Sequence, residues 1–125
     1  MRDGKDAGMK QKRVLLTRKG GPEVLEIVER EVPEPGPGEA RVRVLATGVA
    51  FADVMMRRGL YPGVPDFPFT PGYDLVGEVE DLGPGVSGVA LGQRVAALTQ
   101  VGAHAQYVAL PAGELVPVPA GVDAA

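Results

Sequence analysis

The chain has 125 residues, a formal net charge of −3 and no cysteine. This length fits one domain, and the lack of cysteine excludes disulfides, zinc–thiolate centres, iron–sulfur clusters and a cysteine nucleophile. The acidic balance argues against a nucleic-acid binder, which would carry a basic patch. No apolar run approaches the roughly 20 residues of a membrane span, and residues 1–13 have no signal-peptide core. We therefore expect a cytoplasmic protein that contacts no membrane.

The N-terminal third of the sequence predicts three short strands. Residues 1–9 are polar, and we expect them to form a disordered extension. Apolar positions then predict strands over 14–17 and 25–32, and the proline- and glycine-rich run 33–38 ends the second of them. Residues 41–47 begin with a strict alternation of arginine and valine, the best period-two signal in the chain.

One segment, 51–58, is predicted to be a helix. Phe51, Val54 and Met55 fall on one face at helical spacing. Asp53 in the first turn suits the helix dipole, and Gly59 follows as a C-cap.

The rest of the chain predicts a proline-rich loop over 60–72 and then further strands, over residues 75–82, 94–99, 105–110 and 115–118. Eighteen glycines and 12 prolines supply the turns. Short strands divided by such turns predict a mainly β fold, a compact β-barrel with one or two short helices. The tail ends like the approach to a helix, with Asp123 as N-cap, and this favours a fragment of a longer protein.

Three local patterns could carry chemistry, and each has a plainer interpretation. Residues 83–88 match the dinucleotide pattern G-x-G-x-x-G, but no helix is predicted after them, which favours a β-turn. His104, the only histidine, could form a metal site with Asp53 and Asp74, although a turn or surface histidine is the favoured interpretation. Ser87, the only serine, lacks a nucleophile elbow.

Two tyrosines, Tyr61 and Tyr73, flank the proline-rich loop. Aromatic rings in an irregular loop commonly serve packing. The alternative is a wall against a planar ligand, where the ring stacks and the hydroxyl orients.

Several segments match motifs in a fixed order. Residues 71–79 resemble a P-G-x-E-x-x-G-x-V element, residues 92–95 resemble G-D-R-V, and residues 102–107 resemble G-x-x-A-E-Y. Residues 10–25 resemble the opening, and residues 48–62 the segment around the active site, of quinone oxidoreductases of the medium-chain dehydrogenase/reductase superfamily.

The resemblance implies a GroES-like β-barrel over residues 10–125, the catalytic or substrate-binding domain of such enzymes. In the family a Rossmann domain follows and binds NADP or NAD, and hydride passes from the nicotinamide to a quinone or another conjugated carbonyl. The protein then supplies the pocket and the orientation, while the cofactor carries the chemistry. The chain would be the substrate-binding half of an NAD(P)H-dependent oxidoreductase and inactive alone.

Two departures from the zinc-dependent alcohol dehydrogenases of the superfamily imply zinc independence. Ala50 stands where those enzymes carry a cysteine, and Tyr73 stands where they carry the histidine of G-H-E. Quinone oxidoreductases often carry asparagine at the position of Ala50, and alanine cannot make the corresponding hydrogen bond near the nicotinamide. We therefore expect no zinc site.

The resemblance places Tyr61 near the nicotinamide end of the cleft, with Tyr73, Asp53 and Ala50 as further walls. It assigns no certain catalytic residue, and it leaves the cofactor-binding residues mainly to the Rossmann domain. The expected partner is a small-molecule substrate rather than a nucleic acid.

Apolar side chains in and after the predicted helix lead us to expect homo-oligomers at high concentration. Met55, Phe67, Phe69 and the tail would leave apolar surface exposed, and large exposed patches rarely stay unpaired.

Two non-enzymatic classes are alternatives. A co-chaperonin-like protein would need an apolar docking loop, and the candidate segment 18–24 contains one large apolar residue, Val24. A stand-alone GroES-like barrel that binds a small molecule or a protein partner without catalysis is the other alternative.

Overall fold

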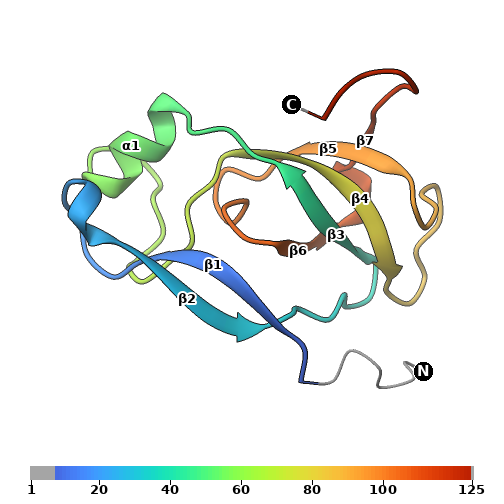
Figure 1. Cartoon of the computed structure of the whole chain (residues 1–125), viewed down its shortest axis with the longest axis horizontal. Helices are drawn as coiled ribbons and strands as arrows, with labels where there is room; N and C mark the ends of the chain where they lie inside the picture. The colour runs from blue at the N-terminus through green and yellow to red at the C-terminus, as the bar shows by residue number, and fades with distance from the viewer. Residues whose placement is uncertain (1–7, 125) are drawn as a thin grey trace.

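A computed structural model describes residues 8–124 of the chain (Figure 1). Most of the regular structure is β. The elements are β1 (Lys10–Leu16), the 3-10 turn η1 (Pro22–Val24), β2 (Leu25–Glu31), β3 (Glu39–Ala46), α1 (Phe51–Arg57), β4 (Asp74–Leu82), β5 (Arg94–Leu98), β6 (Tyr107–Pro111), the 3-10 turn η2 (Ala112–Glu114) and β7 (Val116–Pro117). The prediction of a mainly β domain with one short α-helix is confirmed.

The strands pair antiparallel in two sheets. Five strands form a sheet in the order β6-β3-β4-β5-β7, and β1 and β2 form a separate hairpin. Two isolated bridges, Arg13 with Ala105 and Leu16 with Phe69, join the hairpin to the rest of the domain. In Figure 1, α1 and the hairpin lie at one end and the five-stranded sheet at the other. The predicted barrel therefore takes the form of two sheets joined by bridges.

A first core lies within the five-stranded sheet. Strand β4 buries every second residue, including Leu75 and Val79, so that one face of the strand meets the interior. Val42 of β3 and Val95 of β5 are fully buried beside them. The alternating apolar positions of the sequence thus produce the core by strand periodicity.

Arg41 departs from the alternation predicted for β3, because it is buried together with its valine neighbour. The register of β3 against β4 shifts between residues 41 and 42, as a β-bulge does. Its Nε lies 2.6 Å from Glu80 Oε1, and its guanidinium carbon lies 5.9 Å from the Tyr107 ring centroid. The ion pair and the ring together provide partners for a charge that is 3% exposed.

A second core packs beneath α1 and consists of Leu16, Val24, Met56 and Phe69. Phe69 is only 8% exposed, and Phe67 packs against the same cluster with its ring centroid 5.2 Å from that of Phe69. The prediction of exposed apolar surface is therefore wrong for Phe69, because the loop folds back onto β1 through the Leu16–Phe69 bridge, whereas Phe67 is half-buried.

Exposed apolar surface is found elsewhere. Leu98, the last residue of β5, is 69% exposed, and Val116 in β7 is 60% exposed. Val122 in the tail is half exposed. The prediction that the tail exposes apolar surface is thus confirmed. The homo-oligomer itself remains a prediction.

The residue pattern predicts the position of α1 correctly. The helix covers Phe51–Arg57, and Gly59 follows it with φ 75°, a left-handed conformation that suits a glycine C-cap. The turn at residues 83–88 leads into β5 without a helix, as expected for a β-turn.

The start of β1 was predicted too late. The strand begins at Lys10, because Gln11 Oε1 accepts a hydrogen bond from Tyr107 N–H at 2.9 Å and Lys10 pairs with Glu31. Of the predicted extension over 1–9, residues 1–7 lie outside the described residues, and the Met9 carbonyl accepts a hydrogen bond from Val32 N–H.

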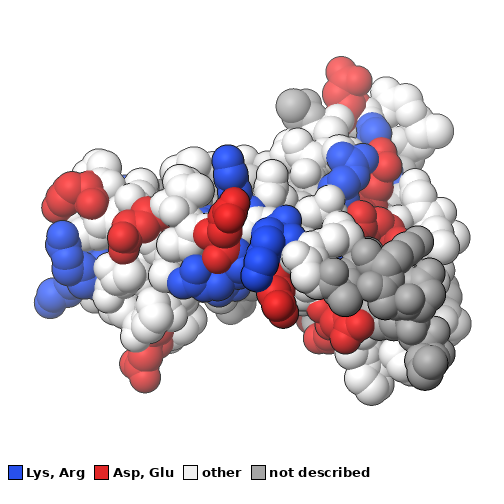
Figure 2. Space-filling model, turned by 60° about the horizontal axis from the view of Figure 1, so that its bottom comes forward, with Lys and Arg blue, Asp and Glu red and all other residues white. Residues whose placement is uncertain are grey.

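Charged side chains of both signs alternate over the face shown in Figure 2. Lys10 Nζ and Glu31 Oε1, for example, lie 4.0 Å apart across the hairpin. Within residues 8–124 no helix has the length and apolar character that crossing a membrane requires.

Candidate functional site

Tyr61 lies near the start of the proline-rich loop over 60–72, and Tyr73 directly follows its end. Both rings are half-buried and pack against the core beneath α1. A side-chain hydrogen bond with Tyr61 raises the pKa of the Tyr73 phenol above its ordinary value, and the nearby Tyr61 charge raises it further.

A cavity of about 280 Å³ opens beside Tyr61. Met56 of α1 and Tyr61 line it together with three residues of the turn after β5, Thr99, Gln100 and Val101. Gln100 has φ 66°, the only positive φ at a non-glycine residue among those described. Such backbone conformations cluster at functional sites, so Gln100 joins the candidate site.

Backbone hydrogen bonds connect the turn after β5, which lines this cavity, to Gly72 and Tyr73. The Tyr73 carbonyl accepts from Thr99 N–H at 2.7 Å and from Gln100 N–H at 3.0 Å. Thr99 Oγ1 donates to the Gly72 carbonyl at 2.7 Å. The turn after β5 is thereby fixed against the segment that carries Tyr73.

The raised pKa of the Tyr73 phenol gives a first testable prediction. We expect the Tyr73 phenol to titrate above the ordinary tyrosine pKa, and Tyr61→Phe to bring its pKa back down, because the substitution removes the bond. NMR titration with ring-labelled tyrosine measures this directly, with Tyr107 as internal reference. A Tyr73 pKa that is unchanged by Tyr61→Phe would contradict the pairing.

Asp53 and Ala50 lie apart from the tyrosine cavity. Asp53 is 5% exposed and its Oδ2 accepts a hydrogen bond from Ala50 N–H at 2.7 Å, which caps α1. Asp53 lines a different cavity, and neither Asp53 nor Ala50 lines the one beside Tyr61. The structure thus joins Tyr61 with Tyr73, and Asp53 with Ala50, as two separate pairs.

His104 lies in a bend before β6, in keeping with the turn histidine that the sequence favours, but its side chain is not on the surface. Its side chain is 13% exposed, its Nε2 lies 2.9 Å from the Gly48 carbonyl, and the same atom lies 4.0 Å from Asp53 Oδ2. The burial has a tertiary cause, because the His104 backbone bonds both to Pro71 and to Val14 of β1.

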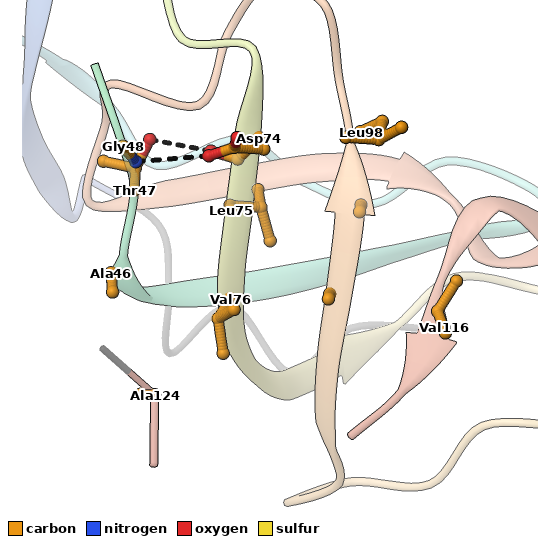
Figure 3. Close-up of a pocket in the computed structure, with 11 residues that line it drawn as sticks. Ala46, Thr47, Gly48, Asp74, Leu75, Val76, Leu98, Val116 and Ala124 are labelled. Atoms are coloured by element: carbon orange, nitrogen blue, oxygen red, sulfur yellow. Dashed lines mark hydrogen bonds between the residues drawn. The ribbon is translucent and has the colours of Figure 1, made fainter. Parts of the chain in front are cut away.

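A cavity of about 570 Å³ lies over β4, β5 and β7 (Figure 3). Its walls are mainly aliphatic and include Leu98 and Val116. Its one carboxylate, Asp74, is engaged, since Oδ1 accepts from Gly48 N–H at 3.2 Å and the Asp74 carbonyl accepts from Thr47 Oγ1 at 2.7 Å. This cavity offers apolar contact area rather than acid–base chemistry.

Among the residues that the structure describes, no three side chains of His, Asp or Glu gather in a group that could hold a metal ion. We predict that protein dialysed after exposure to zinc retains less than stoichiometric zinc, because Ala50 and Tyr73 offer no ligand where related zinc enzymes carry cysteine and histidine. Elemental analysis checks this, and one zinc per chain that His104→Ala removes would contradict it.

Comparison with known proteins identifies relatives of this fold. Residues 36–120 match the family described as the alcohol dehydrogenase GroES-like domain. The quinone oxidoreductase of Pseudomonas aeruginosa is 42% identical over 113 residues, which cover 90% of this chain and 34% of the relative. A 2-haloacrylate reductase of Burkholderia is 38% identical, covering 87% of this chain and 34% of the relative.

Solved structures agree with these matches. The human synaptic vesicle membrane protein VAT-1 homolog-like protein has a TM-score of 0.89 and 34% identity, covering 93% of this chain and 38% of that one. A mycobacterial protein complexed with NADPH has a TM-score of 0.81 and 35% identity, covering 90% of this chain and 35% of that one. The chain thus spans about a third of the length of these relatives, and it belongs to the alcohol dehydrogenase GroES-like domain family, in the quinone oxidoreductase-like branch of the medium-chain dehydrogenase/reductase superfamily.

Proposed function

We propose that this chain is the acceptor-binding part of a cytoplasmic, zinc-independent, NAD(P)H-dependent oxidoreductase that reduces quinones or other conjugated carbonyls. The names of two relatives, quinone oxidoreductase and 2-haloacrylate reductase, support the substrate class. Quinones and acrylates share a carbon–carbon double bond conjugated to a carbonyl or carboxylate. Such an acceptor gains negative charge on oxygen as hydride adds to carbon, so a hydrogen-bond donor at that oxygen stabilises the transition state.

The cavity that Tyr61 lines is the observation that carries the proposal. The Tyr61 hydroxyl would donate to the acceptor oxygen, and Tyr73, whose ring packs against the same core, would help to hold the Tyr61 ring in place. Gln100, which also lines this cavity, offers a second polar group to orient the acceptor.

The proposal assigns the nicotinamide cofactor to the whole enzyme and only the acceptor to this chain. The mycobacterial neighbour is complexed with NADPH, which supports NADPH as the cofactor of the whole enzyme. Within residues 8–124 the glycine turn at 83–88 runs into β5 without a helix, so it does not fit a pyrophosphate, which dinucleotide-binding folds hold at a helix N-terminus. Bound NADPH would supply the hydride, and this chain would hold the acceptor.

A chimera tests the proposal. This chain would replace the matching segment of the Pseudomonas aeruginosa quinone oxidoreductase, and NADPH oxidation would be followed with 1,4-benzoquinone and with 2-chloroacrylate. We expect turnover with at least one of these conjugated acceptors. A chimera that folds and binds NADPH but reduces neither would overturn the proposal and favour a module that binds small molecules without catalysis.

A further inference from the structure

Strand β2 forms an open edge of the molecule. Among the described residues it pairs only with β1, and in Figure 1 it lies along one margin of the hairpin. Six of its seven residues are exposed, and Ile27 is 68% exposed. The strand contains no proline, lysine or bulge, which commonly keep an edge strand from pairing with another chain. β2 is therefore open to pairing with a further strand.

The contacts of β1 show which backbone groups of β2 point outward. Val14 and Leu16 donate their N–H groups to carbonyls of other segments, each at 2.9 Å, and so point away from β2. In an antiparallel pair, directly opposite residues either bond to each other or both point outward. Val14 lies opposite Ile27, so the N–H and C=O of Ile27 point outward, and by alternation those of Glu29 do as well. Within residues 8–124 neither of these two N–H groups has a hydrogen-bond partner.

The sequence of β2 is complementary to itself in one antiparallel register. When two copies of the strand align on a two-fold axis through Val28, Ile27 lies opposite Glu29 of the second copy, and their outward-facing groups bond to each other. Glu26 then lies opposite Arg30 of the second copy in a non-hydrogen-bonded pair, where side chains approach most closely. Opposite charges at such positions stabilise a sheet, and the two-fold axis forms this ion pair twice.

Neighbouring registers lose this match. An axis through Glu29 places that carboxylate directly opposite its own copy, which is destabilising. An axis through Ile27 places Glu26 opposite Val28 and leaves Arg30 without an acidic residue across the new edge. In the register through Val28, by contrast, Ile27 and its copy are diagonal neighbours on the other face of the sheet, within reach of one another. Charge and apolar contact thus select the same register.

We propose that the outer edge of β2 binds a second copy of this chain, so that the two hairpins form one continuous antiparallel sheet. On pairing, Arg30 would exchange its exposed contact with the Glu29 carbonyl, 2.8 Å from Nη1, for Glu26 of the second copy. A strand edge buries little area, so the dimer is expected to be weak, at the low end of protein interfaces. No residue of β2 lines the cavity beside Tyr61, and the proposal does not depend on the acceptor site.

Sedimentation equilibrium of the 125-residue chain, combined with amide hydrogen exchange, tests the proposal. We expect the average mass to rise from one chain toward two between about 10 µM and about 1 mM. Over the same range, exchange of the Ile27 and Glu29 amides should slow, because these N–H groups become bonded. The Val28 and Arg30 amides face β1 and should be protected throughout. A chain that stays monomeric, or a dimer in which Ile27 and Glu29 remain unprotected, would overturn the proposal.

Charge reversal tests the register. Glu26→Arg alone and Arg30→Glu alone each place like charges opposite each other twice, and each should raise the dissociation constant of the dimer at least about fivefold. An equimolar mixture of the two variants pairs unlike charges at both positions and should restore dimerisation as a mixed dimer. Glu114→Arg makes the same charge change at an exposed residue of η2 and should leave dimerisation unchanged. Failure of the mixture to dimerise, or an equal loss in Glu114→Arg, would contradict the proposed pairing.

Discussion

Gly72→Ala is expected to lower the free energy of unfolding by about 3 kcal/mol or more, because it combines backbone strain with steric overlap. Gly72 has φ 121°, a conformation that side chains rarely adopt, and an added Cβ would overlap the backbone nitrogens of Ala103 and His104. Neither neighbour can yield easily, since His104 N–H donates to Pro71 and Ala103 N–H donates to Gly72. Chemical denaturation followed by circular dichroism measures the loss.

Gly113→Ala is the matched control for this substitution. Gly113 is exposed in η2, has no positive φ, and an added Cβ would have no heavy atom within 4 Å. Its free energy of unfolding should change by no more than about 0.5 kcal/mol. Equal stability of the two variants would show that the close packing of Gly72 against residues 103–104 does not exist in solution.

Tyr61→Phe is expected to lower kcat/KM of the chimera about a hundredfold to a thousandfold, the usual loss when one donor to a developing oxyanion is removed. The ring and its packing remain, so that stability should change little. Tyr73→Phe should have a smaller effect, because Tyr73 does not line the cavity beside Tyr61. Steady-state kinetics with 1,4-benzoquinone measure both.

The third tyrosine provides the control. Tyr107 lies in β6, away from the cavity, and its ring contacts Arg41. Tyr107→Phe keeps that ring, so kcat/KM should stay at the level of the unmodified chimera. A loss in Tyr107→Phe equal to that in Tyr61→Phe would mean that the effect of position 61 is general and not specific to the acceptor site.

Features fixed by local sequence were predicted well. Residues Phe51–Arg57 carry helical spacing, an acidic first turn and a terminal glycine, and these signals act within the helix itself. The strands of the five-stranded sheet were found within a few residues because their apolar positions alternate and glycine or proline ends them.

Features that depend on contacts distant in sequence were missed. β1 starts early because Gln11 and Lys12 bond to residues 106 and 107, more than 90 positions away. The burial of Phe69 depends on its bridge to Leu16, and the burial of His104 depends on β1 and the segment before Tyr73. The pattern of residues within one segment does not predict contacts with residues that are distant in sequence.

The candidate site was predicted in part. The resemblance named Tyr61 and Tyr73, which the fold brings together. It did not name Gln100, whose positive φ arises where the turn after β5 bonds to the Tyr73 carbonyl. The glycine at position 102 was the only local signal of an unusual backbone there.

The proposal that this chain holds the acceptor while the hydride donor is bound elsewhere is tested most directly by assaying the isolated 125-residue chain beside the chimera. NADPH oxidation with 1,4-benzoquinone would be measured for both under the same conditions. Rate enhancement of this kind depends on holding the reacting groups together, so we predict turnover by the chimera and none above background by the isolated chain. Equal activity of the two would contradict the division of the site, and activity in neither, with NADPH bound to the chimera, would contradict the assignment of the acceptor site to this chain.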